Sequence, residues 1–300
     1  MHETSSGSGS LPDMSQLQVM VGHSRATRQI AREVSAASEL DVTVLISGER
    51  GVGRRLIART IHDRSLRHSG PFVWMNCACL PQSRLESELC GDSTAEVKDA
   101  AGGARGMLEA ANGGTIVLHE IGQLSRRVQG RLLHFTETKQ IQRVGSVQVT
   151  RSDARLMAIT HRALADAVAD HAFRDDLFYR MNVIHIRVPP LRERPEDVPA
   201  LFRYFLCVQA ARLGRPRVDL THDALSCLAD YAWPGNVREL KAMAERLALT
   251  CELESVGVDA LPVNVVRRSS SRARSRHIFR MLSPLGEHAR HVRDEHAVGG

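Results

Sequence analysis

The sequence predicts an α/β domain built on a mostly parallel sheet with helices on both faces, followed by a small all-helical domain. Two patterns indicate this. Short apolar, β-branched runs of the kind found in buried parallel strands alternate with helical periodicity up to about residue 188. After Pro189-Pro190 the strand signal stops, and only helical patterns remain up to Leu261. At 300 residues the chain is long enough for one large domain and a smaller one.

The first elements surround a glycine-rich loop. A helical pattern covers residues 24–39, a strand is expected at 42–46, and a helix follows the loop from Leu56 to His62. Further strands are expected at 72–75, 115–118, 154–159 and 183–186. We therefore divide the chain into four parts: a flexible leader (1–20), the α/β domain (21–188), the helical domain (189–262) and a basic, disordered tail (263–300).

Composition excludes several classes of protein. The 6 cysteines form no CxxC pair and have no histidine at zinc spacing, so they indicate incidental or buried thiols. No apolar run approaches the roughly 18 residues of a membrane span, and no export leader is present, so we expect a cytoplasmic protein without membrane contact. The arginine-rich tail is a candidate for sequence-independent contact with DNA phosphates, and a solvated, inert end is the alternative.

The loop Gly48-Glu49-Arg50-Gly51-Val52-Gly53-Arg54-Arg55 has the glycine spacing of a phosphate-binding loop and stands between a strand and a helix, as such a loop requires. Its backbone amides can cradle phosphates. Arg54 replaces the usual lysine and Arg55 the usual Ser or Thr. A planar guanidinium can contact phosphates without fitting the pocket of an ammonium group. The loop predicts nucleotide binding by Gly48, Glu49, Gly51, Val52, Gly53, Arg54 and Arg55.

A second element is the strand at 115–118, which ends in His119-Glu120. An Asp that holds Mg²⁺, followed by a Glu that orients the attacking water, is the usual pair at such a strand end. Here His119 takes the Asp position and Glu120 alone remains as a catalytic candidate. Neutral imidazole is a poor ligand for Mg²⁺, so we predict no protein metal ligand and impaired Mg²⁺ binding. His119 as a tolerated strand-end residue is the simpler interpretation.

Four further strings occur in order: Trp-Met-Asn-Cys-Ala at 74–78, Phe-Arg-Asp-Asp-Leu-Phe-Tyr-Arg at 173–180, Pro-Pro-Leu-Arg-Glu-Arg at 189–194 and Trp-Pro-Gly-Asn-Val-Arg-Glu-Leu at 233–240. With the two nucleotide elements, they make residues 21–261 resemble the central AAA+ domain of sigma-54-dependent transcription activators. The resemblance implies a P-loop AAA+ sheet with a helical lid. It also implies an ATPase that forms rings, acts between subunits and remodels sigma-54 RNA polymerase.

The resemblance also implies roles for single residues. Asn76 matches the residue that restrains the catalytic Glu120. Arg174 and Arg180 match the arginines that reach into a neighbouring subunit's site, where such fingers stabilise transition-state charge. Arg238 matches the lid residue that senses the nucleotide. The alternative for each arginine is an ordinary surface ion pair.

Two departures from the family pattern affect function. Thr160-His161-Arg162 stands where the family has Thr-Asn-Arg, so the first sensor, Thr160 and His161, lacks its amide. The Gly-Ala-Phe-Thr-Gly-Ala sequence that engages sigma-54 is replaced by the sequence at 95–100. Val97 and Lys98 supply neither its aromatic ring nor its hydroxyl. We expect engagement of sigma-54 to be impaired.

Three hypotheses remain open. The first is a transcription regulator that binds ATP weakly or not at all, lacks efficient hydrolysis, and assembles as a ring with itself or with a related AAA+ subunit. The second is a working ATPase activator, which Glu120, the two finger arginines and Arg238 favour. The third is a truncated or decaying relative without function. Substitution patterns alone do not separate drift from adaptation.

Overall fold

The computed structural model describes residues 21–95, 103–215, 219–250 and 255–267. The predictions for the leader 1–20 and for the loop at 96–100 lie outside these residues, as does most of the predicted tail. Within the described chain, two compact units form. The first extends to Arg194 and includes Gly235–Arg238, and the second holds the remaining residues from Pro195 onward.

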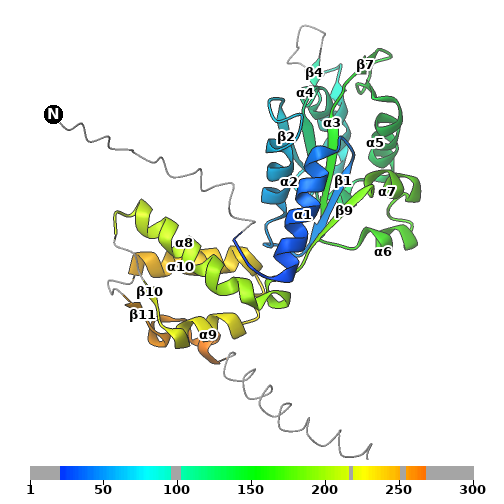
Figure 1. Cartoon of the computed structure of the whole chain (residues 1–300). Helices are drawn as coiled ribbons and strands as arrows, with labels where there is room; N and C mark the ends of the chain where they lie inside the picture. Colours follow the sequence, from blue (N-terminus) through cyan, green and yellow to red (C-terminus); the bar gives the residue numbers. More distant parts are fainter. Residues whose placement is uncertain (1–20, 96–102, 216–218, 251–254, 268–300) are drawn as a thin grey trace, which may run out of the picture. The chain divides into compact units, whose positions relative to one another are not determined.

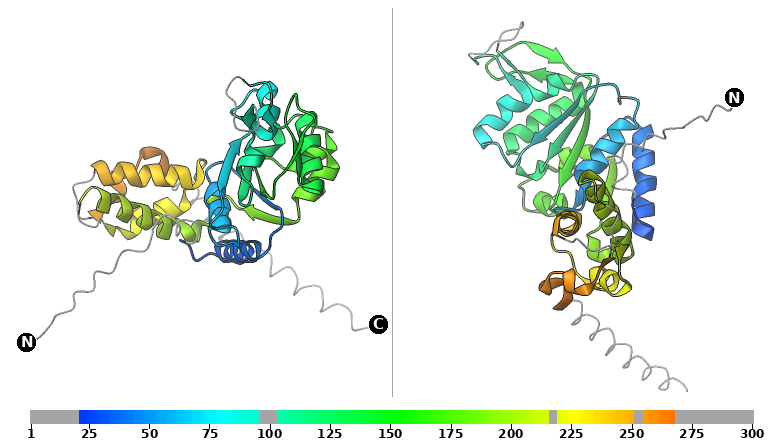
Figure 2. Two further views of the ribbon diagram at one scale, coloured as in Figure 1. Left: turned by 90° about the horizontal axis from the view of Figure 1, so that it is seen from above. Right: turned by 90° about the vertical axis from the view of Figure 1, so that its left-hand side faces the viewer.

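The first unit contains a five-stranded parallel sheet in the order β2-β5-β8-β1-β9. Its strands are β1 (Val44–Gly48), β2 (Phe72–Asn76), β5 (Thr115–His119), β8 (Arg155–Thr160) and β9 (Ile184–Val188). Figures 1 and 2 show them side by side in the middle of this unit. The predicted α/β fold with a parallel sheet is confirmed. Because every strand runs in the same direction, their carboxyl ends share one edge, which is where ligands bind in such folds.

Helices cover both faces of this sheet (Figure 1). They are α1 (Arg25–Glu39), α2 (Arg54–Asp63), α3 (Gln82–Cys90), α4 (Met107–Ala110), α5 (Arg126–Thr138), α6 (Leu164–Ala169) and α7 (Asp175–Met181), with 3-10 turns η1 (Ile121–Gln123) and η2 (Leu191–Glu193). Short antiparallel pairs join β3 (Gly91–Asp92) to β4 (Ala104–Arg105) and β6 (Gln140–Gln142) to β7 (Val149–Arg151).

Alternation along the strands divides the core into two layers. In β1, Val44 and Ile46 pack into the cluster that includes α1 and α2, whereas Leu45 packs into the cluster on the opposite face. Helix α1 presents Ile30, Val34 and Ala37 to its layer, spaced as an amphipathic helix requires. The period of two in the strands and of 3.6 in the helices therefore accounts for the three-layer arrangement.

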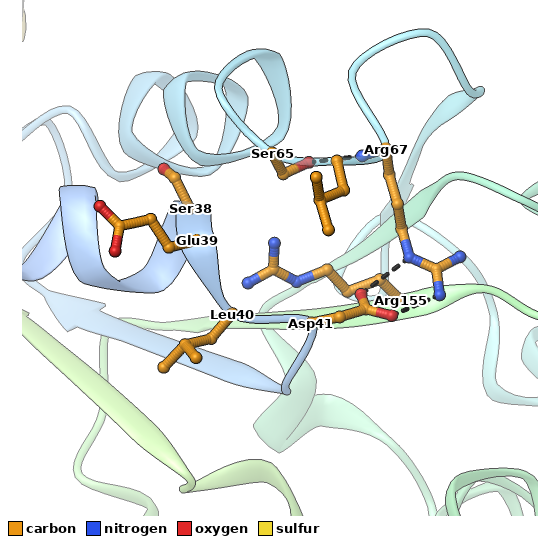
Figure 3. Close-up of a pocket in the computed structure, with 8 residues that line it drawn as sticks. Ser38, Glu39, Leu40, Asp41, Ser65, Arg67 and Arg155 are labelled. Carbon is orange, nitrogen blue, oxygen red and sulfur yellow. Dashed lines mark hydrogen bonds and ion pairs between the residues drawn. The ribbon is translucent and has the colours of Figure 1, made fainter.

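The amino-terminal edge of the sheet is held by ion pairs, and Figure 3 shows the one between Arg67 and Asp41. Arg67 donates to both carboxylate oxygens of Asp41, from Nε at 2.8 Å and from Nη2 at 2.6 Å, and its Nη2 lies 3.0 Å from Asp153 Oδ2. Buried Arg155 donates to the carbonyls of Ala37 and Val42. This cluster connects the segments that precede three strands, at the end of the sheet opposite to the glycine loop.

The second unit is helical, as predicted. It contains α8 (Val198–Arg212), α9 (His222–Asp230) and most of α10 (Asn236–Thr250), with η3 (Pro195–Asp197) and η4 (Val258–Ala260). Fully buried Trp233 donates from its indole nitrogen to the carbonyl of Leu228 at 2.8 Å. The sequence predicted only helices here, but β10 (Asp219–Leu220) and β11 (Ser255–Val256) form a parallel pair. Two-residue strands are too short to leave a periodic signal.

The boundaries of the two compact units differ from the predicted domain boundaries. The sequence placed the boundary after residue 188, whereas the compact units divide after Arg194. The sequence also ended the helical domain at 262, whereas residues 263–267 are helical and Val265 is fully buried.

Candidate functional site

The glycine loop joins β1 to α2 at the carboxyl edge of the sheet. Gly51 and Gly53 have φ angles of +85° and +103°, in the region that favours glycine. A Cβ on Gly51 would lie 2.3 Å from the carbonyl oxygen of Gly235, so only glycine allows that backbone approach. Within the described residues, the amides of Gly51, Val52 and Gly53 donate no hydrogen bond. These amides and the start of α2 form an arrangement suited to an anion.

Arg54 opens α2 and is buried, with 6% of its side chain exposed. Its Nη2 lies 3.2 Å from Oε1 of Glu120. Its Nη1 is also buried and has no hydrogen-bond partner among the described residues. Burial lowers the pKa of the guanidinium, although Glu120 opposes this shift. An unsatisfied buried donor of this kind costs stability until an acceptor reaches it, which marks the position as a place for an anionic oxygen.

Glu120 follows β5 with φ 61° and ψ 51°, a left-handed conformation that costs a residue with a Cβ roughly 1–2 kcal/mol. Its amide donates to the carbonyl of Ile159 at 2.7 Å, which anchors this turn. Oε2 lies 2.5 Å from Nδ1 of His161. Burial alone would raise the pKa of Glu120, but the His161 hydrogen bond and the Arg54 charge outweigh it and lower the pKa below 4.5. The carboxylate is therefore ionised at neutral pH, with both oxygens engaged.

His119 ends β5 beside Trp74 and Asn76. Its ring lies 5.2 Å from the Trp74 ring, and its Nδ1 lies 3.3 Å from Asn76 Oδ1. Burial lowers the pKa of His119, so its imidazole is neutral at pH 7. Arg55 does not point into the loop, because its guanidinium stacks over Trp74 at 4.8 Å. The two substituted positions thus pack against one tryptophan.

Asn76 does not restrain Glu120 in this conformation. Its amide donates to Cys79 Sγ at 2.8 Å, and its Oδ1 accepts from the amide of Ala78 at 3.1 Å. The contact with Glu120 is made instead by His161, because the imidazole reaches the carboxylate directly. The role implied for Asn76 by the resemblance therefore differs from its position here. Thr160 of the same sensor bonds its own loop, donating to the carbonyl of Arg162 at 2.9 Å.

The two predicted finger arginines lie at α7. Arg174 precedes the helix and forms a two-point ion pair with Asp176, with contacts of 3.0 and 2.6 Å. This partner raises the pKa of Arg174. Arg180 is exposed, and the described chain shows no ion pair for its side chain. Neither arginine touches Arg54 or Glu120 in this chain.

Sequence reasoning missed Asn236, which holds the outer half of the glycine loop. The residue is fully buried with φ 53°. Its Nδ2 donates to Glu49 Oε2 and to the carbonyl of Arg50, both at 3.1 Å, and its Oδ1 accepts from the amide of Leu191 at 2.8 Å. The string at 233–240 contains this residue, but the resemblance implies a role only for Arg238.

Glu49 is also bound by Arg192, whose guanidinium makes contacts of 2.8 and 2.6 Å with the two carboxylate oxygens. That hydrogen bonding lowers the pKa of Glu49. The side chain of Glu49, which is predicted to bind the nucleotide, thus holds the loop through contacts with Arg192 and Asn236. Arg238 joins the same assembly through its backbone amide, which donates to the carbonyl of Gly51 at 3.2 Å. Its charge is close enough to contribute to the lowered pKa of Arg54.

The residues at the loop do not suit Mg²⁺. Arg55 supplies no hydroxyl, His119 supplies a neutral nitrogen, and the one carboxylate, Glu120, is paired with Arg54. Hard Mg²⁺ prefers oxygen ligands. Throughout the ranges that the structure describes, no group of three or more His, Cys, Asp or Glu residues could hold a metal ion. Nor does any helix in those ranges have the length and apolar character needed to cross a bilayer.

Comparison with known proteins identifies the two parts of the chain. Residues 20–187 match the family described as the Sigma-54 interaction domain, and residues 192–278 match the family described as the AAA+ ATPase lid domain. The transcriptional regulatory protein ZraR of Klebsiella oxytoca is 43% identical over 82% of this chain and 56% of its own length. The DNA-binding transcriptional regulator NtrC of Azospirillum brasilense is 41% identical over 81% of this chain and 50% of its own length.

A solved structure agrees with these relatives. The crystal structure of NtrX from Brucella abortus in complex with ATP superposes with a TM-score of 0.75 and 33% identity, covering 82% of this chain and 54% of NtrX. The chain spans about half the length of the relatives it matches. The family match covers more than half of the sequence and includes the glycine loop, Glu120 and α7. The chain therefore belongs to the Sigma-54 interaction domain family, and it carries the AAA+ domain of the sigma-54-dependent transcriptional regulators.

Proposed function

We propose that this chain is a transcription regulator that binds an adenine nucleotide at loop 48–55 but hydrolyses it poorly. The ion pair between Arg54 and Glu120 carries the proposal. The residue at the lysine position and the residue that should orient the attacking water neutralise each other at 3.2 Å in a buried setting.

Nucleotide binding is supported by the donors around the loop. The amides of Gly51, Val52 and Gly53 and the buried Nη1 of Arg54 all lack acceptors in the described chain. Phosphate oxygens would satisfy each of them, because charge-assisted hydrogen bonds to phosphate are among the strong ones. The related NtrX was crystallised in complex with ATP. The backbone amide of Arg238 donates to the carbonyl of Gly51, and this contact supports a role for Arg238 in sensing the nucleotide.

Impaired hydrolysis is supported by the state of Glu120. If a phosphate binds Arg54 in place of Glu120, the Oε1 atom of Glu120 loses its partner. Its Oε2 atom still contacts Nδ1 of His161 at 2.5 Å. A carboxylate held this way is poorly placed to orient a water molecule for in-line attack. Mg²⁺, when bound in such sites, neutralises charge on the phosphates, and neither Arg55 nor His119 offers it an oxygen ligand.

The chain's partners follow from the same family. We propose assembly as a ring with itself or with a related AAA+ subunit, in which Arg174 and Arg180 reach a neighbouring site. Arg174 would first have to leave Asp176. The sequence at 95–100 argues against productive engagement of sigma-54. The basic tail is a candidate for sequence-independent contact with DNA, and the cytoplasm is the expected location.

Calorimetric titration with ATP and a phosphate-release assay test this function. We expect saturable binding with slow turnover, and faster turnover in a triple variant that carries Arg54→Lys, His119→Asp and His161→Asn. Arg64→Lys, on an exposed arginine outside the loop, is the matched control and should change nothing. Absence of ATP binding would contradict the proposal.

A second candidate, a working ATPase activator, is favoured by the ionised state of Glu120. Rapid turnover by the unmodified chain, abolished by Glu120→Gln, would establish this alternative and exclude impaired hydrolysis. A triple variant that binds ATP but gains no turnover would point to a decaying relative.

A further inference from the structure

A hollow adjoins the first residues of the glycine loop. It encloses about 440 Å³ at the carboxyl ends of β1, β8 and β9. Its lining includes Leu45 and Leu164, which belong to the core layer opposite to that of α2. The hollow therefore lies on the face of the sheet opposite to α2, and Gly48 and Glu49 of the glycine loop also line it. Its volume is in the range of small-molecule sites.

The lining of the hollow is partly apolar and partly polar. Leu45, Leu164 and Phe178 are among its apolar residues. Among its polar residues, Ser47 Oγ lies 2.7 Å from His185 Nε2. Burial lowers the pKa of His185, so this imidazole is neutral at pH 7. The pair offers hydrogen bonding without charge.

Two arginines at the hollow have no acidic partner. Arg162 and Arg187 line it, and no ion pair or side-chain hydrogen bond is found for either within the described chain. Arg192, which also lines the hollow, differs because it is already paired with Glu49. Of the lining carboxylates, Glu193 alone is left to offset the two free guanidinium groups. The hollow therefore carries an uncompensated positive charge as well as an apolar part of its lining.

We propose that this hollow binds a small organic oxyanion with an apolar body. Guanidinium groups bind carboxylate and phosphate oxygens through paired hydrogen bonds, whereas the apolar part of the lining suits a ring or a short hydrocarbon chain. Arg162 and Arg187 hold the oxyanion, and the Ser47–His185 pair orients it. The proposal goes beyond the nucleotide-binding function proposed above, because neither Arg162 nor Arg187 is among the residues predicted to bind the nucleotide, although Gly48 and Glu49 of the glycine loop also line the hollow.

Occupancy of this hollow is coupled to Glu120 through one residue. His161 lines the hollow, and the same side chain holds Oε2 of Glu120. Arg162, the next residue, shares its loop. An anion bound by Arg162 would therefore change the orientation of the His161 ring and the contact of that ring with Glu120.

Calorimetry with phthalate, an aromatic dicarboxylate, tests the proposal on the full chain at low salt, with inorganic phosphate and uncharged benzyl alcohol as comparison probes. We expect saturable phthalate binding that Arg162→Gln and Arg187→Gln each weaken about tenfold or more, since a charge-assisted hydrogen bond is lost. Arg64→Gln, which removes an exposed arginine elsewhere in the same unit, should leave the affinity unchanged.

Three results would overturn the proposal: no saturable binding of phthalate or phosphate, equal binding of benzyl alcohol, or equal affinity in all three variants. Loss of anion binding in Arg54→Ala but not in Arg162→Gln would also overturn it, because the anion would then occupy the glycine loop. Both hollow arginines are exposed, so their variants should fold, which circular dichroism verifies.

Discussion

Removal of the Arg54–Glu120 ion pair should reveal strong energetic coupling between the two residues. Both side chains are 6% exposed, and the contact is 3.2 Å long. With an effective dielectric constant of about 20, Coulomb's law gives roughly 5 kcal/mol of attraction, and desolvation of two buried charges cancels part of it. We expect a coupling on the order of 2–3 kcal/mol.

A double-mutant cycle measures this coupling. Arg54→Met, Glu120→Gln and the double variant are unfolded in urea and followed by circular dichroism. The exposed pair Arg84–Glu88 in α3, separated by one helical turn, is the matched control and should give only about 0.3–0.5 kcal/mol. A coupling for Arg54–Glu120 that is no larger than the control value would refute the view that this pair closes the site.

Three further predictions concern pH, the loop and a helix cap. The pKa of Glu120 is lower in the folded state than its unfolded value near 4.5. The ionised carboxylate therefore stabilises the fold above pH 4.5, and this stabilisation is lost as the pH falls through the folded-state pKa. The Tm difference between the wild type and Glu120→Gln should shrink across that acidic window. Gly51→Ala should lower the Tm more than Gly53→Ala. Both glycines have a positive φ, but only the Cβ added at position 51 would clash with a backbone oxygen, and equal losses of Tm would contradict this prediction. Ser24→Ala should cost about 1 kcal/mol in urea unfolding, because Ser24 accepts from the amide of Thr27 at 3.0 Å, and an unchanged midpoint would show that this cap is unimportant.

The local elements of the fold were predictable because they leave local signals. The strand expected at 115–118 is β5 at Thr115–His119, and the helix expected at 24–39 is α1 with Ser24 as its N-cap. The order of the strands was not predictable from those signals. Sequential β1 and β2 are separated in the sheet by β5 and β8, and that order depends on packing across the whole unit.

The site was predictable as a set of positions but not as a set of contacts. Motif spacing indicated Arg54, Glu120 and His161 separately. Nothing in the spacing indicated that Arg54 and His161 would hold opposite oxygens of one carboxylate. Arg55 is predicted to bind the nucleotide, and in this structure its planar guanidinium stacks on the face of Trp74, a contact that the motif spacing does not indicate. Which partner a side chain contacts depends on the other groups that lie near it in the fold, and motif spacing does not indicate those groups.

The position of Trp74 has an optical consequence. The chain has two tryptophans, one in each compact unit. Trp74 contacts both the guanidinium of Arg55 and the ring of His119, whereas Trp233 is fully buried in the helical unit. The emission of Trp74 should therefore respond to events at the glycine loop. The protein carries its own fluorescent reporter of the site, and no label is needed to watch it.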